Sequence, residues 1–157
     1  MFKHILVAID GSTYSQKALP TAIEVAQKFG SEVCVLHVSE HDRGRAAVFS
    51  VETPAEATRM VGDAVKTVRD AGITAKGELR DAAAGHVAKA IVETSADRGI
   101  DLIVMGSRGL SDVQGLLLGS VTHKVMQLAD VPVLVDRGHA RVKTVSNAAV
   151  QKPVAAY

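Results

Sequence analysis

The chain has 157 residues, 47% of them hydrophobic, so it can bury one substantial core and a single domain is expected. Its formal net charge of +1 and its aromatic content of 3% argue against nucleic-acid and acidic-membrane partners. No segment approaches the roughly 18 apolar residues that a membrane span needs, and the run 5–9 is too short for a secretory signal. We therefore expect a cytoplasmic protein.

Short apolar runs alternate with amphipathic stretches along the first half of the chain. The predicted elements are a strand over 5–9, a helix over 15–29, a strand over 32–38, a helix from Pro54 to Gly72 and a weaker strand over 73–79. The first run is continuously apolar, which is typical of a strand covered on both faces. Residues 41–52 carry charge and little periodicity, and we expect a loop there.

The second half continues the alternation. Asp81 can cap a third helix whose inner face begins at Ala84, and Gly99 closes that helix. A strand over 102–105, a helix over about 121–129 and a strand over 131–135 follow. The pattern predicts an α/β domain over 1–137 with a mostly parallel sheet. Residues 138–157 form a basic tail that we expect to be flexible, with docking on a neighbouring subunit or partner as the alternative.

A glycine motif follows the fourth predicted strand directly. Gly106-Ser107-Arg108-Gly109 is followed, nine residues later, by Gly119-Ser120, which opens the next helix. Glycines let main-chain amides approach a ligand, and a helix N-terminus directs N–H groups at an anion. The motif therefore predicts a phosphate site. It is neither a Walker A loop, because Gly115–Ser120 contains no lysine, nor a dinucleotide fingerprint, because only Gly11 follows the first strand.

Asp10 ends the first strand and has two interpretations. If the strand order is 3-2-1-4-5, the first and fourth strands are neighbours where the order reverses, and ligands of open parallel sheets bind there. Asp10 would then face Gly106–Gly109 and accept hydrogen bonds from a ribose. The alternatives are that Asp10 is only a turn or capping residue, that the glycines are ordinary turn glycines, and that Arg108 is solvated rather than paired with phosphate.

No constellation of residues predicts catalysis or a metal site. The six histidines show no metal-ligand spacing with cysteine or acidic residues. His37 alternates with core residues and is interpreted as a hydrogen-bonded residue near the core, while His123 is expected at the surface. Cys34, the single cysteine, lies in an apolar run and is expected to be a buried, unreactive thiol. We predict no catalytic residue and no protein metal ligand.

The last predicted strand, Val131–Val135, would lie at the edge of that sheet. Pro132 suits an edge strand or a strand start because its missing N–H is tolerated there. A short apolar edge invites pairing with another chain, so a homodimer through this strand is expected. The alternative is that the tail of the same subunit covers it.

Residues 1–137 resemble the universal stress protein family, in its nucleotide-binding branch. The resemblance rests on 5–12 (ILVAIDGS), 35–38 (VLHV), 101–109 (DLIVMGSRG), 115–121 (GLLLGSV) and 131–135 (VPVLV). It implies an open sheet of five parallel strands in the order 3-2-1-4-5 with helices on both faces, like the adenine nucleotide alpha hydrolases, and a dimer through the last strand. The connection 80–86 and the tail depart from the family pattern and inherit no role.

The resemblance also implies a ligand, ATP or else AMP or ADP. Asp10 and Gly106 would approach the ribose and the main chain of Val38 the adenine. The phosphates would be surrounded by Gly109, Gly119, Ser120 and Val121, with the Thr122 hydroxyl and with Mg²⁺ or Mn²⁺ bound through the phosphates. The leading hypothesis is an ATP-binding regulatory protein of the stress response. The alternatives are a slow ATPase or autophosphorylating protein and a nucleotide-free structural dimer.

Overall fold

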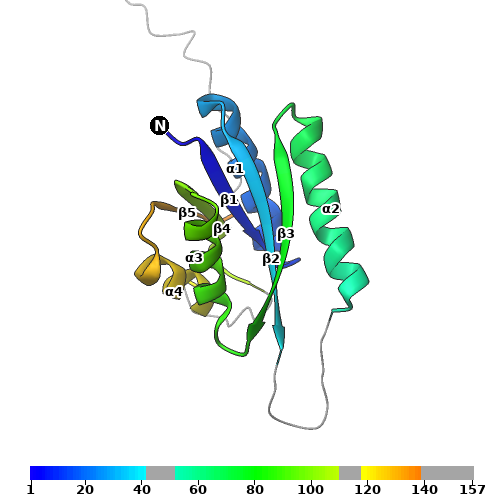
Figure 1. The fold of residues 1–157 in the computed structure, drawn as a ribbon, viewed down its shortest axis with the longest axis vertical. Helices are drawn as coiled ribbons and strands as arrows, with labels where there is room; N and C mark the ends of the chain where they lie inside the picture. Colours follow the sequence, from blue (N-terminus) through cyan, green and yellow to red (C-terminus); the bar gives the residue numbers. More distant parts are fainter. Residues whose placement is uncertain (42–51, 110–117, 139–157) are drawn as a thin grey trace, which may run out of the picture.

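Strands and helices alternate along the residues that the structure, a computed structural model, describes: 1–41, 52–109 and 118–138. In chain order they are β1 (His4–Ile9), α1 (Thr13–Phe29), β2 (Glu32–His41), α2 (Pro54–Asp70), β3 (Ala75–Ala83), α3 (Val87–Asp97), β4 (Leu102–Gly106), α4 (Ser120–Leu128) and β5 (Val133–Asp136). The strands form one parallel sheet in the order β3-β2-β1-β4-β5 (Figure 1). The predicted α/β fold and strand order are confirmed.

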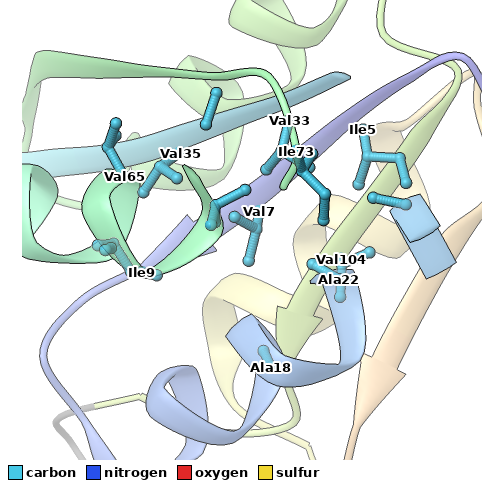
Figure 2. Close-up of a cluster of buried hydrophobic side chains, with 14 of the residues drawn as sticks. Ile5, Val7, Ile9, Ala18, Ala22, Val33, Val35, Val65, Ile73 and Val104 are labelled. Carbon is cyan, nitrogen blue, oxygen red and sulfur yellow. The ribbon is translucent and has the colours of Figure 1, made fainter. Parts of the chain in front are cut away.

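Each face of the sheet is covered by a pair of helices. On one face, Ile5 and Val7 of β1 pack with Ala18 and Ala22 of α1 and with the apolar side of α2 (Figure 2). On the other face, a second cluster joins strand residues to α3 and α4; its buried members are Leu6, Leu36, Ala88, Ile91, Ile100, Ile103, Met105 and Val125. Successive residues of a strand point to opposite faces. Strands buried on both faces therefore need the continuous apolar runs that the sequence shows.

The β2–β3 pair is longer than predicted. β1 ends at Ile9, opposite His37, whereas the β2–β3 register continues to His41 opposite Ala83. The prediction that Asp81 caps a helix is therefore wrong. Asp81 belongs to β3, and its Oδ1 lies 2.7 Å from His41 Nε2. Cross-strand pairing takes residues up to 83 into the sheet, so α3 begins only at Val87.

The other predicted boundaries need smaller changes. Ser12 caps α1 by accepting a hydrogen bond from Ser15 N at 3.2 Å, so that helix starts at Thr13. Thr53 and Glu56 form a capping box at the start of α2, where Pro54 was predicted to begin the helix. β5 begins after Pro132, which has no N–H to donate. Most of the predicted loop 41–52 and the tail from 139 lie outside the described residues.

None of the helices in the described ranges has both the length and the apolar character needed to cross a membrane.

Glu78 on β3 provides a test of stability against pH. Burial alone would raise the pKa of Glu78, but hydrogen bonds from Arg98 (2.8 Å) and Arg80 (2.6 Å) outweigh it, and the net pKa is lowered. A carboxyl with a lowered pKa in the fold adds stability above its unfolded value of about 4.3, and loses it as pH falls through the folded value.

We therefore expect Glu78→Gln to cost about 1 kcal/mol at pH 7 and progressively less below pH 4. Urea unfolding of both chains at several pH values between 3 and 7 measures this difference. A difference that does not change with pH would contradict it.

Candidate functional site

The candidate site is a pocket of about 560 Å³ at the carboxyl ends of the central strands. All nine residues predicted for the site line it: Asp10, Val38, Gly106, Arg108, Gly109, Gly119, Ser120, Val121 and Thr122. They come from the ends of β1, β2 and β4 and from the start of α4. β1 and β4 are neighbours where the strand order reverses, which is the expected ligand position in an open parallel sheet.

Asp10 and Gly109 lie close together at the pocket wall. Oδ1 of Asp10 accepts a hydrogen bond from Ser12 N at 2.9 Å, so Asp10 does shape the turn that leads into α1. Its other oxygen points at the glycine motif, because a Cβ added to Gly109 would lie 2.6 Å from Asp10 Oδ2. The interpretation of Asp10 as a turn residue is confirmed, and its role toward a ribose stays a prediction. Gly109 is needed for close approach to this carboxylate rather than for an unusual backbone angle.

The first glycine of the motif lies against α1. A Cβ on Gly106 would lie 2.7 Å from the carbonyl carbon of Tyr14. The same tyrosine contacts the motif a second time, since the Arg108 guanidinium carbon lies 5.8 Å from the centre of its ring. The glycine motif is thus packed on the first turn of α1.

The start of α4 is suited to bind an anion. Its N-cap residue is Gly119, which has no side chain that could accept hydrogen bonds from the N–H groups of the first turn. The Gly119 N–H donates to Ser107 O at 2.7 Å, which links the helix start to the glycine motif. The Thr122 hydroxyl was expected to face the phosphates. It is instead buried and donates a hydrogen bond to Gly106 O at 2.9 Å. That bond commits its proton to the main chain instead of to a phosphate.

Several lining residues were not predicted. They are Ala8, Ile9, Ser15, Leu36, His37, Ser39, Glu40, Glu52, Ala84, Val87, Ile91 and Met105. Ser39 and Glu40 lie on the part of β2 beyond the predicted strand end, so a correct β2 length would have identified them. Val87 and Ile91 enter from α3, whose start was misplaced.

His37 is buried, with 4% of its surface exposed, and is fully hydrogen-bonded. Its Nδ1 lies 2.9 Å from Ile9 O and its Nε2 lies 2.7 Å from Glu52 Oε2. The interpretation of His37 as a satisfied residue near the core is confirmed. The contact with Glu52 also brings a carboxylate to the pocket wall, which the sequence alone did not indicate.

Negative side chains outnumber positive ones in the lining. Asp10, Glu40 and Glu52 are acidic, and Arg108 is the only lysine or arginine among the described residues that line the pocket. A phosphate would therefore depend on the main-chain N–H groups of the glycine motif and α4, together with Arg108. No group of three or more His, Cys, Asp or Glu that could hold a metal occurs within 1–41, 52–109 and 118–138.

Cys34 lies away from this pocket, near the amino ends of the strands, where it lines a smaller cleft of about 200 Å³. It is half-buried rather than buried. Burial, followed by the nearby Glu78 charge, raises the pKa of its thiol. A raised pKa disfavours the reactive thiolate, in agreement with the expectation of an unreactive thiol.

Comparison with known proteins gives a consistent set of matches. The sequence profile described as the universal stress protein family matches residues 1–137. The universal stress protein YxiE of Bacillus subtilis is 35% identical over 156 residues, covering 87% of this chain and 100% of that protein.

Two solved structures are similar in fold. The hypothetical protein MJ0577 of Methanocaldococcus jannaschii has a TM-score of 0.68 at 29% identity, covering 86% of this chain and 95% of that one. A universal stress protein solved in complex with cAMP has a TM-score of 0.64 at 25% identity, covering 86% and 97%.

Proposed function

Because this chain belongs to the universal stress protein family, we propose that it is an adenine-nucleotide-binding regulatory protein of the stress response, acting in the cytoplasm. The observation that carries the proposal is the close approach of Gly109 to Asp10, which brings the glycine motif and the end of β1 into one pocket. A pocket of about 560 Å³ is in the size range of small-molecule sites. The related protein solved with cAMP supports an adenine nucleotide as the ligand class.

Different parts of the pocket lining would bind the adenine, the ribose and the phosphates. Val38 would meet the adenine through its main chain, beside the apolar side chains of Leu36 and Ile91. Asp10, an acceptor of hydrogen bonds, suits the ribose hydroxyls together with Gly106. The phosphates would bind where N–H groups and a cation meet, at Arg108, Gly109, Gly119, Ser120 and Val121. Thr122 would support this end by its bond to Gly106 O.

ATP is the proposed nucleotide, with ADP or AMP as other occupants. Three carboxylates and one arginine in the described lining leave little positive charge for a triphosphate. A divalent cation would supply that charge by binding the phosphates themselves, since the described residues offer no cluster of metal ligands.

Regulation would work by a shift in population. A nucleotide that binds one arrangement of the glycine motif and the α4 start more tightly than another stabilises that arrangement, and a partner distinguishes the two. The mechanism needs binding and no turnover.

The test is mass spectrometry of small molecules released from the freshly purified, denatured protein, followed by calorimetric titration with ATP and Mg²⁺. We expect either bound adenine nucleotide or saturable binding. A protein that carries none and binds none would contradict the proposal, while steady phosphate release would favour a slow ATPase.

A homodimer through β5 is part of the proposal. β5 lies at the sheet edge, its four residues are only half-buried, and the exposed apolar residues Met126 and Leu128 lie on the preceding α4. No strand of the described residues pairs with the outer edge of β5, and an open edge of this kind invites pairing with another chain. We expect sedimentation equilibrium to give a dimer, and Val135→Lys to give a folded monomer. A monomeric wild-type chain would contradict the dimer.

A further inference from the structure

We propose that Tyr14 is a positioning residue for nucleotide binding, because it holds Arg108 at the phosphate end of the pocket. The inference rests on the proposed function and adds to it a residue that supports the arginine by which the site would distinguish a nucleotide from its nucleoside. Tyr14 is not among the residues that line the pocket, and no part of its sequence pattern indicates a role in binding.

The lining of the pocket carries little positive charge. Arg108 is the only lysine or arginine among the described lining residues, whereas Asp10, Glu40 and Glu52 are acidic. A phosphate group entering this pocket gains attraction from Arg108 and repulsion from the carboxylates. The position of one guanidinium therefore has a large influence on whether the phosphate is accepted.

The ring of Tyr14 lies beside that guanidinium. The Arg108 Cζ lies 5.8 Å from the centre of the Tyr14 ring, within the distance of a cation–π interaction. A cation–π contact needs only the positive charge near the ring, whereas phosphate binding uses the N–H groups of the guanidinium. One arginine can therefore contact the ring and donate to a phosphate at the same time.

The main chain of Tyr14 is held in place by its position at the start of α1. It is the second residue of α1, directly after the turn in which Ser12 caps the helix by binding Ser15 N. Its main chain lies against Gly106, where an added Cβ would come within 2.7 Å of it. A ring carried by a main chain that is packed on the end of β4 limits where Arg108 can lie, and so reduces the side-chain freedom that Arg108 loses when phosphate binds.

The test compares adenosine, AMP and ATP with Mg²⁺ by calorimetric titration. We expect Arg108→Gln to weaken AMP and ATP about 10- to 100-fold and to leave adenosine within twofold. Tyr14→Leu, which removes the aromatic face but keeps apolar bulk, should weaken AMP and ATP about two- to fivefold and leave adenosine unchanged. Tyr14→Phe keeps the ring and should match the wild type. Thermal unfolding of each variant checks that the fold is retained.

The double variant decides whether Tyr14 acts through Arg108. Tyr14→Leu should cost nothing further in the Arg108→Gln background, because the guanidinium it positions is gone. Equal losses in both backgrounds, or a loss of adenosine as large as that of ATP, would overturn the positioning role while leaving the proposed function intact. A wild-type chain that binds none of the three ligands would overturn both.

Discussion

A chain carrying Gly119→Asp is expected to keep its fold and lose its nucleotide. Gly119 is the N-cap of α4 with φ −70° and ψ 154°, a conformation open to any residue, and it supplies no side-chain cap. Aspartate is a favoured N-cap, and its carboxylate would accept hydrogen bonds from N–H groups of the first turn. Its carboxylate would then occupy the place proposed for a phosphate. Repulsion between this carboxylate and the phosphates should lower ATP affinity about 100-fold or more.

Stability should change little. The nearest atom to an added Cβ is the Arg108 Cα at 3.2 Å, a tight contact whose cost the new cap offsets, so we expect a change within about 1 kcal/mol. Gly119→Asn is the matched control, because it caps the helix with nearly the same size and no charge. Calorimetric titration with ATP and thermal unfolding measure the two effects. An aspartate variant that binds ATP as well as the asparagine variant would place the phosphates elsewhere.

Two local features of the sequence, the continuous apolar runs and the glycine motif, account for what could be predicted without the structure. Continuous apolar runs indicated strands buried on both faces, and the core residues of β1 and β4 are in fact buried on both faces. The glycine motif is predicted to face Asp10 only if the strand order is 3-2-1-4-5, which makes the first and fourth strands neighbours. That order depends on pairing between segments far apart in the chain, and the family resemblance supplied it.

The errors have a common physical origin at the carboxyl end of the sheet. Asp81 and Ala84 fit a helix start by local preference, yet pairing with β2 up to His41 keeps Asp81 in the sheet. Tertiary pairing here overrides a local capping signal. Glu52 was missed for a related reason, because its place in the pocket depends on the side chain of His37 rather than on any motif near it. Local patterns thus indicated the phosphate end of the pocket better than the end formed by β2 and α3.

Adding one methyl group is expected to have opposite effects at two glycines of this chain. Gly106 ends β4 and is buried, and a Cβ there would lie 2.7 Å from the Tyr14 carbonyl carbon and 2.8 Å from its oxygen. Main-chain atoms cannot rotate away as a side chain can, so β4 and α1 must separate. We expect Gly106→Ala to lower the free energy of unfolding by about 1–3 kcal/mol. It should also weaken ATP binding, because both Tyr14 and the glycine motif move.

Gly62 provides the matched control. It lies exposed within α2, and no atom falls within 4 Å of an added Cβ. Alanine there gains helix propensity, so Gly62→Ala should raise the free energy of unfolding by about 0.5–1 kcal/mol and leave ATP binding unchanged. Urea unfolding and ATP titration of both variants compare the two positions directly. If Gly106→Ala proved as stable as the wild type, the close packing of β4 on α1, and with it the support proposed for Arg108, would be wrong.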